Sequence, residues 1–339
     1  MMSNSINWLA GMTSKILDIG YISKSLTTHD QRFLSALDEI FTVNSYFLEN
    51  LSIEKELTNF EGRLLVASPL STGLNAIADS ELRPVIGICL AYELNEESKN
   101  ELVKKEIIKN VTKCVAILCD SKFIASRLRN EFKFTGPVMI LPFGCDQEYF
   151  LDIAFLESEV LTILSTRNWT STHSNGTLIS ALNKLNESDV EFQALMMGTG
   201  PLLTPATIKS GERIGIKFGG LFDFEILRKK FQLHQIYVST SLSDGSSVSL
   251  LEALSSGRIC ICRDFPSNRE WIKDGTNGFL FKDDEELASI LIHISRMNHE
   301  DKMRFSSNAR LSVIDRANWK NNKIVFQNFI QKEAECHVI

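Results

Sequence analysis

Residues 239–281, STSLSDGSSVSLLEALSSGRICICRDFPSNREWIKDGTNGFLF, form the segment that decides the fold. An apolar strand is expected to end near Thr240, a loop with an acid and a glycine follows, and a helix is expected from about Ser247. A second apolar run, RICICRDF, comes directly after that helix. Strand, short loop, helix and strand in this order are typical of a β-α-β unit in a parallel sheet.

The same alternation extends over most of the chain in both directions. In the first half, apolar runs begin at residues 16, 63, 84, 114 and 137, and amphipathic stretches such as HDQRFLSALDEI lie between them. The series restarts with EVLTILSTRN, whereas residues 44–61 show no clear pattern. Runs that are apolar throughout are typical of strands covered on both faces. We therefore predict an α/β protein with two doubly wound, Rossmann-like domains whose strand ends face a common cleft.

The composition is that of a globular protein and argues against several classes of function. Of the 339 residues, 44% are hydrophobic and 23% are charged, and the net charge is −6 without a basic stripe, so no nucleic-acid partner is expected. The seven cysteines show no C-x-x-C spacing and the six histidines no metal-ligand spacing, which indicates buried free thiols and no metal site. The start, MMSNSINWLAGMTSK, lacks the pattern of a signal peptide, and no apolar run is long enough to span a bilayer. We expect a cytoplasmic protein; a peripheral contact with the inner face of a membrane and the oligomeric state stay open.

The loop SLSDGSS has the composition of an anion site. Gly245 lets the backbone approach a ligand, and the helix start at Ser246, Ser247 and Val248 leaves N–H groups unpaired. Such amides, at the positive end of a helix dipole, suit a phosphate. Glu252 stands about two helical turns after Asp244, where a carboxylate can reach the hydroxyls of a ribose. The alternative is that Asp244 only caps the helix and Glu252 is only a polar helix residue.

These segments, in this order, resemble the donor-binding half of the retaining GT-B glycosyltransferases, the glycosyl transferases of group 1. That family marks its donor site with two carboxylates separated by seven residues, followed by a helix of small residues and a glycine turn. Further upstream, LTILSTRNW resembles its first donor-domain strand, LMMGTGPL its G-x-G-P turn, IKFGGLFDFEIL its strand–glycine–helix segment, and ILPFGCDQEYF its hinge between domains. The resemblance covers residues 137–281 well and the N-terminal third weakly.

The resemblance assigns a role to individual positions of this chain. Glu252 falls on the carboxylate that binds the donor ribose, and Asp244, in place of the usual Glu, on the one beside the donor sugar. Arg167 falls on the arginine that binds the donor phosphate. Two further donor-site positions lie in the glycine turns, at Gly198 and Gly220.

His173 is the more serious departure, because the family usually has a lysine six residues after the arginine. A fixed cation beside the leaving phosphate supplies much of the catalysis in such transfers, and a histidine is charged only part of the time at neutral pH. Three explanations stay open: His173 is a weaker phosphate clamp, Arg263 or Arg269 enters the site instead, or the donor carries a single phosphate. Arg269 lies in DFPSNREW, where Asn268 and Glu270 are alternatively a simple helix cap.

The N-terminal domain offers weaker candidates for contacts with the acceptor or the sugar. His29, Asp30 and Arg32 follow the first predicted strand, where a loop normally faces the cleft. The alternative is that Thr28 or Asp30 caps the helix and His29 is solvated. Glu93, after the strand in PVIGICL, is a further candidate.

The resemblance also implies the domain plan and the activity. We predict an acceptor-side domain at residues 1–153, a domain for the nucleotide-sugar donor at residues 154–315, and a C-terminal helix at residues 316–339 that packs back towards the first domain. The hypothesis is a hexosyltransferase-like enzyme that transfers a sugar, with retention and without metal or other cofactor, to a carbohydrate or lipid-linked acceptor in bacterial surface or lipid-linked glycan assembly. A GT-B sugar-nucleotide epimerase, a non-catalytic nucleotide-sugar-binding protein and an unrelated anion-binding α/β module stay open as alternatives.

Overall fold

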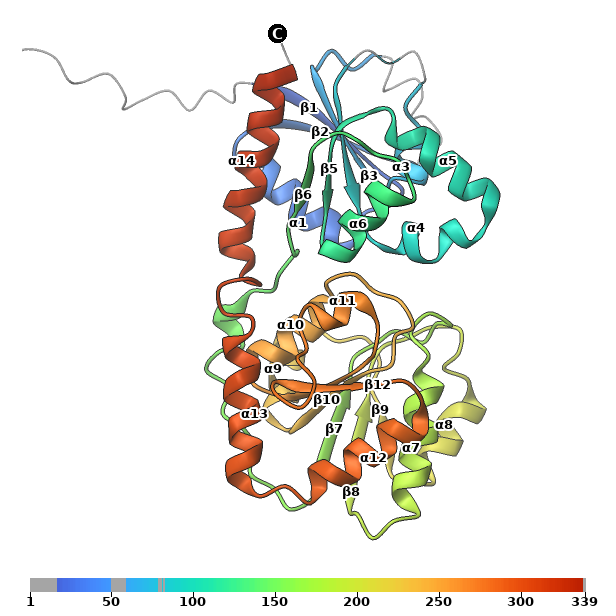
Figure 1. Ribbon diagram of the computed structural model, residues 1–339, viewed down its shortest axis with the longest axis vertical. Coiled ribbons are helices and arrows are strands. Elements are labelled where there is room, and N and C mark those ends of the chain that lie inside the picture. Colours follow the sequence, from blue (N-terminus) through green and yellow to red (C-terminus); the bar gives the residue numbers. More distant parts are fainter. Residues whose placement is uncertain (1–16, 50–58, 79–80, 82, 338–339) are drawn as a thin grey trace, which may run out of the picture.

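Two parallel sheets, one in each half of the chain, form the framework of the protein (Figure 1). The computed structural model describes residues 17–49, 59–78, 81 and 83–337. Each sheet has six strands, in the orders β2-β1-β3-β4-β5-β6 and β12-β11-β10-β7-β8-β9. The prediction of two doubly wound domains is therefore confirmed; MMSNSINWLAGMTSK and the start of the first apolar run lie outside the described residues.

In the N-terminal domain, helices connect strands that are largely buried on both faces. Its strands are β1 (Asp18–Ser23), β2 (Thr42–Phe47), β3 (Leu64–Ser68), β4 (Val85–Cys89), β5 (Cys114–Cys119) and β6 (Val138–Ile140). Its helices are α1 (Thr28–Asp38), α3 (Thr72–Asn75), α4 (Tyr92–Asn95), α5 (Glu101–Val111) and α6 (Lys122–Asn130), with short 3-10 turns η1 (Glu97–Lys99) and η2 (Gln147–Tyr149).

The C-terminal domain repeats the alternation of strands and helices. Its strands are β7 (Leu161–Ser165), β8 (Phe192–Met196), β9 (Ile216–Phe218), β10 (Ile236–Ser239), β11 (Ile259–Arg263) and β12 (Gly278–Phe281). Its helices are α7 (Asn175–Asn186), α8 (Pro205–Glu212), α9 (Phe224–Gln232), α10 (Val248–Ser255), α11 (Pro266–Arg269), α12 (Asp284–Ser295) and α13 (His299–Leu311).

The strand order of the C-terminal sheet reverses between β7 and β10, which are neighbours in the sheet although two strands, β8 and β9, separate them in the sequence. A reversal leaves a crevice between the loops that follow the two strands, because their connections run to opposite faces of the sheet. In this protein those are the loop that contains Arg167, after β7, and the loop that contains Asp244, after β10.

The last helix, α14 (Trp319–His337), runs along the N-terminal domain, whereas α13 before it lies against the C-terminal domain (Figure 1). Trp319, Phe326 and Ile330 belong to the same buried cluster as Phe33 and Tyr21 of the N-terminal domain. The chain therefore crosses between the domains twice, at residues 140–160 and again between α13 and α14.

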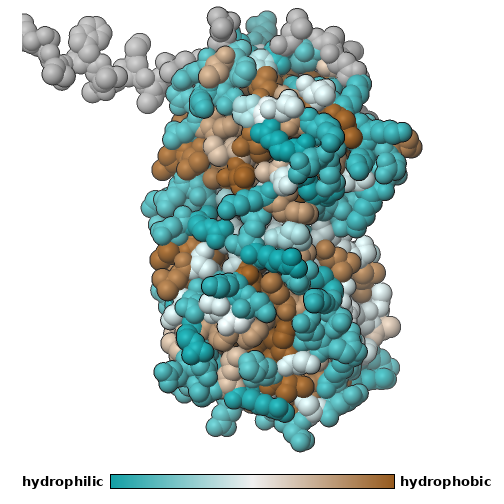
Figure 2. All heavy atoms as spheres, viewed as in Figure 1, coloured by the Kyte–Doolittle hydropathy of each residue, from teal (hydrophilic) through white to brown (hydrophobic). Residues whose placement is uncertain are grey.

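On the side of the molecule shown in Figure 2, no large continuous apolar face is visible. In Figure 2, apolar residues form several separate groups among hydrophilic ones on the side shown. No helix in the described part of the chain is both long and apolar enough to cross a bilayer. All seven cysteines are free, and all except Cys336 are buried.

Candidate functional site

A cavity of about 470 Å³ lies between the two domains, at the carboxyl ends of both sets of strands. Both domains contribute to its wall, the C-terminal domain with mostly polar residues and the N-terminal domain with mostly apolar ones. The lining residues are His29, Leu90, Tyr92, Asp120, Phe143, Thr166, Arg167, Asn168, His173, Asp244, Ser246, Ser247, Val248, Ser249 and Glu252.

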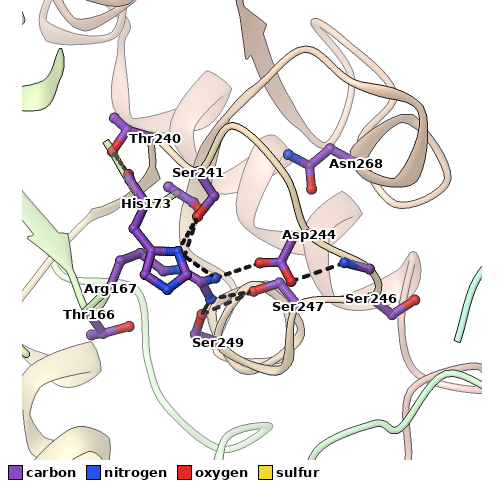
Figure 3. A network of polar contacts seen from close by, with 12 residues as sticks. Thr166, Arg167, His173, Thr240, Ser241, Asp244, Ser246, Ser247, Ser249 and Asn268 are labelled. Atoms are coloured by element: carbon purple, nitrogen blue, oxygen red, sulfur yellow. Dashed lines mark hydrogen bonds and ion pairs between the residues drawn. The ribbon is translucent and has the colours of Figure 1, made fainter. Parts of the chain in front are cut away.

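Arg167 is the centre of a polar network on the C-terminal wall (Figure 3). Its Nη2 forms an ion pair of 2.5 Å with Oδ2 of Asp244, and its Nη1 donates to the hydroxyls of Ser247 at 2.8 Å and Ser249 at 2.9 Å. Its Nε donates to the hydroxyl of Ser241 at 3.1 Å. The side chain of Arg167 is only 13% exposed, so these contacts fix the cation at the cavity wall.

His173 is brought to the same cluster, six residues after Arg167. Its Nδ1 lies 3.2 Å from Nη2 of Arg167 and 3.1 Å from the hydroxyl of Ser241. Because a guanidinium can only donate, Nδ1 must accept, and the ring proton is on Nε2. Burial, reinforced by the charge of Arg167, lowers the pKa of His173 to about 4. A neutral imidazole does not supply the second cation, so His173 does not act as a weak cationic clamp in this structure.

The two other candidate cations, Arg263 and Arg269, do not line the cavity. Arg269 pairs with Asp264 at 2.6 Å and is 61% exposed, and it does not line the cavity. The guanidinium of Arg263 donates hydrogen bonds to the carbonyl oxygens of Thr240 and Lys282. The expected donor-site role of Arg269 is therefore not supported, because its charge is neutralised outside the site.

In the loop between β10 and α10, more polar groups are hydrogen-bonded within the protein than the sequence predicts. Oδ1 of Asp244 accepts the N–H of Gly245 at 3.0 Å, so both oxygens of this carboxylate have partners. The N–H of Ser246 donates to Oδ2 of Asp120, from the N-terminal domain, at 2.7 Å. A Cβ built on Gly245 would collide with that same oxygen. The glycine thus admits a carboxylate of the protein itself, and the Ser246 amide is not open to a ligand.

The start of α10 keeps open amides at the cavity. Ser247 is the N-cap residue but its hydroxyl does not cap the helix, because it bonds to Arg167 instead. In the described part of the chain, the N–H groups of Val248 and Ser249 have no hydrogen-bond partner, and both residues line the cavity. Open amides at a helix start, beside an arginine, form a site for an anion.

Glu252 lines the cavity although it is only 6% exposed. Its side-chain oxygens have no hydrogen-bond partner among the described residues. Burial raises the pKa of Glu252 to about 8, against the opposing effect of Arg32. The carboxyl group is therefore available to a hydroxyl-bearing ligand.

The two predicted donor-site glycines are Gly198 and Gly220. Neither Gly198 nor Gly220 lines the cavity. Gly198 has φ of +96°, and a Cβ there would approach the carbonyl oxygen of Arg167 to 2.7 Å. Its N–H donates to the carbonyl oxygen of Gly220 at 3.2 Å. A direct contact of either glycine with a ligand is not supported, because neither lines the cavity; Gly198 instead packs closely against the backbone of Arg167.

On the N-terminal wall, His29 lines the cavity and packs on Phe143 with ring centroids 5.4 Å apart. Burial, with a contribution from Arg32, lowers the pKa of His29, so the ring is neutral. Arg32 itself donates to the carbonyl oxygen of Gly144 at 2.8 Å in the hinge. Asp30 belongs to the cap of α1, because its carboxylate accepts the N–H of Thr27 at 2.8 Å.

Glu93 does not line the cavity, so its proposed contact with the reacting sugar is not supported. It is 2% exposed, and its Oε1 accepts the N–H groups of Leu70 at 3.1 Å and Leu90 at 3.2 Å. Burial raises the pKa of Glu93 to about 7. Its role in this structure is to tie together the loops that follow β3 and β4.

Two carboxylates that the sequence did not single out for the cleft connect the domains. Asp120 follows β5 and contacts the loop of Ser246, and Glu270 accepts the N–H groups of Lys122 at 3.1 Å and Phe123 at 2.9 Å at the start of α6. Glu270 thus caps a helix of the other domain rather than its own. Asp120 directly follows an apolar strand, and this position in the sequence could have indicated a residue at the cleft. Nothing in the sequence around Glu270 indicates its contact with the other domain.

Comparison with known proteins finds a family model that matches most of the C-terminal domain. Residues 161–297 match the family model of the glycosyl transferases group 1. An uncharacterised glycosyltransferase of Methanocaldococcus jannaschii is 29% identical over 121 residues, which are 35% of this chain and 31% of that protein. The chain thus matches about a third of the length of this relative.

Solved structures extend the likeness to both domains. Sucrose-phosphate synthase from Thermosynechococcus elongatus has a TM-score of 0.79 at 13% identity, over 94% of this chain and 100% of that chain. HepE of Anabaena, solved in complex with UDP-glucose, has a TM-score of 0.73 at 14% identity, over 93% and 100%. The chain has the GT-B fold. The family match and the relative together support a GT-B glycosyltransferase family. The solved structures show the fold and assign no role to individual residues of this chain.

Proposed function

We propose that this protein is a glycosyltransferase that binds a nucleotide sugar at the C-terminal wall of the cavity and transfers the sugar to an acceptor hydroxyl. The observation that carries the proposal is the combination of Arg167, the open amides of Val248 and Ser249, and the unpaired carboxyl group of Glu252 in one cavity between two domains. An anion site about one helical turn from a free carboxyl group fits the phosphate and the ribose of one nucleotide.

In the proposed mechanism, Arg167 and the amides at the start of α10 stabilise the charge that develops on the leaving phosphate. To do so, Arg167 exchanges at least one of its present partners, Ser247, Ser249 or Asp244, for a phosphate oxygen. Asp244 holds the guanidinium in place until then. The leaving phosphate helps to deprotonate the acceptor hydroxyl, and transfer proceeds with retention, with no protein nucleophile.

The acceptor is proposed to enter along the N-terminal wall, past His29, Leu90 and Tyr92. We propose a carbohydrate or lipid-linked acceptor and a place in bacterial surface or lipid-linked glycan assembly. Two solved neighbours support a nucleotide-sugar donor: HepE was solved with UDP-glucose, and the pneumococcal O-GlcNAc transferase GtfA with UDP and GlcNAc. No group of three His, Cys, Asp or Glu that could hold a metal occurs in the described residues, and independence from metal remains part of the proposal.

The test is thermal shift with a panel of nucleotides and sugar nucleotides, for the wild type and Glu252→Ala, followed by an assay of nucleotide release with and without acceptor glycans. A ligand that binds only the folded state raises Tm, so a selective shift names the donor class. The proposal expects a shift that is lost in the variant, and nucleotide release that depends on acceptor. Absence of any shift in the wild type would overturn the donor site.

A second candidate, a nucleotide-sugar-binding protein without transferase activity, is favoured by one specific observation. The C-terminal wall has a single cation, Arg167, already neutralised by Asp244, and His173 beside it is neutral. Selective binding without turnover, for a broad panel of acceptors, would establish this candidate instead.

A further inference from the structure

Of the described residues that line the cavity, Asp120, Asp244 and Glu252 carry carboxyl groups. They differ in how many carboxyl oxygens have no hydrogen-bond partner in the protein. Asp244 uses one oxygen for Arg167 and the other for the N–H of Gly245. Glu252 is the group proposed for the ribose. Asp120 uses only one oxygen, and the function proposed above gives it no role.

Asp120 is held rigidly at the junction of the two domains. Its Oδ2 accepts the N–H of Ser246 at 2.7 Å, and its carbonyl oxygen accepts the hydroxyl of the same serine at 2.7 Å. Nε1 of Trp271 donates to that hydroxyl at 3.1 Å. Gly245 leaves room for the carboxylate, since any side chain at that position would collide with it. The second oxygen of Asp120 is therefore presented in a defined place.

That second oxygen, Oδ1, is buried and has no hydrogen-bond partner among the described residues, and Asp120 as a whole is 3% exposed. A buried carboxylate oxygen without a partner is costly, and such groups in cavity walls are satisfied when a ligand donates to them. Burial raises the pKa of Asp120 to about 7, against the opposing effect of the hydrogen bond from the Ser246 N–H. Sugar hydroxyls are donors of the required kind.

The location also separates Asp120 from the groups proposed to bind the nucleotide. Asp120 follows β5, at the carboxyl end of the N-terminal sheet, and contacts the loop at Gly245 and Ser246, just before the anion site at the start of α10. A group bound between the anion site and the N-terminal domain is the part of a nucleotide sugar beyond its phosphates.

We infer that Asp120 binds a hydroxyl of the donor sugar through Oδ1 and thereby determines which sugar the protein accepts. This inference rests on the proposed function, because it needs a nucleotide sugar in the cavity. It assigns sugar recognition to a residue of the N-terminal domain, whereas the nucleotide is bound by the C-terminal domain.

The decisive variant is Asp120→Asn. Its amide oxygen can still accept the Ser246 N–H, while its NH2 group takes the place of Oδ1 and presents donors instead of an acceptor. Calorimetry would compare UDP-, GDP-, ADP- and dTDP-linked hexoses with the corresponding free nucleoside diphosphates. We expect the affinity for the best sugar nucleotide to fall roughly 10- to 100-fold, and the affinity for its free nucleotide to change less than about twofold.

Deoxy analogues of the same sugar nucleotide identify the hydroxyl. The analogue that lacks the hydroxyl bound by Asp120 should bind the wild type weakly and lose nothing further in Asp120→Asn, whereas the other analogues lose as much as the parent sugar. Glu270→Gln is the matched control, because Glu270 also bonds to amides across the domains but does not line the cavity. It should leave the preference among sugars unchanged.

The outcomes separate this inference from the proposed function. Equal losses for sugar nucleotide and free nucleotide in Asp120→Asn would mean that Asp120 only shapes the loop, and unchanged affinities for both would mean that no hydroxyl contacts it; either result overturns the inference while the donor site stands. A wild type that binds no ligand of the panel would overturn both.

Discussion

The C-terminal wall of the cavity has polar groups that bind one another, whereas the N-terminal wall has few polar groups, set among apolar ones. Arg167 alone has five polar side chains as partners on the first wall. On the second wall, Leu90, Tyr92 and Phe143 surround His29 and Asp120. A ligand that binds Arg167 must therefore exchange partners with the protein, whereas the N–H groups of Val248 and Ser249 and the carboxyl group of Glu252 on the same wall are open. On the N-terminal wall, Oδ1 of Asp120 has no partner among the described residues, although Oδ2 is bonded to Ser246.

The difference indicates a division of labour. A network in which each group holds the next keeps its geometry without ligand, which suits the constant part of a substrate, its phosphate and ribose. Isolated polar groups on an apolar wall distinguish ligands by the presence or absence of single hydroxyls. Substitutions on the C-terminal wall should affect every ligand, and those on the N-terminal wall should affect selectivity.

The largest effect is expected for Arg167→Ala, which removes the centre of the C-terminal network. Loss of a preorganised cation at a leaving group costs about 10²- to 10³-fold in kcat. Arg167→Lys should recover only part of the rate, since an ammonium cannot bond to Asp244 and the serines with the same fork. Steady-state kinetics of nucleotide release measure both. Arg263→Ala is the control, because Arg263 lies outside the cavity; an equal loss there would show that the effect is structural.

Glu252→Gln should remove a pH dependence of nucleotide binding. The pKa of Glu252 is about 8 in the free protein, and hydroxyl donors favour the ionised form. Wild-type affinity should therefore rise with pH up to about 8, with proton release on binding, and the variant should show a smaller rise. Calorimetry in two buffers of different ionisation enthalpy measures the proton release, and identical release by the variant would contradict the assignment.

The same pKa fixes the sign of a stability effect. For a carboxyl group whose pKa is higher in the folded than in the unfolded protein, the contribution to stability is full below the unfolded value of about 4.3 and is lost as pH rises through the folded value. Glu252 has such a raised pKa, of about 8. Glu252→Gln should therefore melt at a higher temperature than the wild type at pH 9, with the difference shrinking towards pH 5.

Much of the C-terminal wall could be predicted from the sequence because it is local. Asp244, Ser247 and Glu252 lie within one strand–loop–helix segment, and Arg167 follows the strand beside it. The contact of Gly245 with Asp120 could not be predicted, because it joins residues 125 positions apart in different domains. Nor could the neutrality of His173, which depends on its burial beside Arg167.

His173→Lys should strengthen the C-terminal wall in a way that depends on the number of phosphates. The neutral imidazole lies 3.2 Å from Arg167, and an ammonium in its place adds charge where the family resemblance expects it. We expect affinity for a nucleoside diphosphate to rise about three- to tenfold, and affinity for the monophosphate much less. Calorimetry with UDP and UMP, against His173→Gln as the uncharged control, measures this. An equal gain for both nucleotides would indicate general electrostatic attraction rather than a second phosphate position.

The smallest effect on activity is expected for the contact between Glu270 and the start of α6, which joins the two domains outside the cavity. Glu270→Ala leaves the N–H groups of Lys122 and Phe123 at the start of α6 without their partner from the other domain. Loss of such a cap costs about 1 kcal/mol of stability. Because this cap also connects the domains, the cleft should open more easily, and KM for the donor should rise about two- to threefold while kcat changes less.

Asp223→Ala is the matched control for that variant. Asp223 caps α9 by accepting the N–H of Ile226 at 2.8 Å, within one domain and away from the cavity. Its loss should lower Tm by a similar amount and leave KM unchanged, because no contact between the domains is broken. If both variants raise KM equally, the effect follows stability and Glu270 has no part in closure. If only Glu270→Ala raises KM, the contact of Glu270 with α6 helps to hold the two walls of the cavity together when the donor binds.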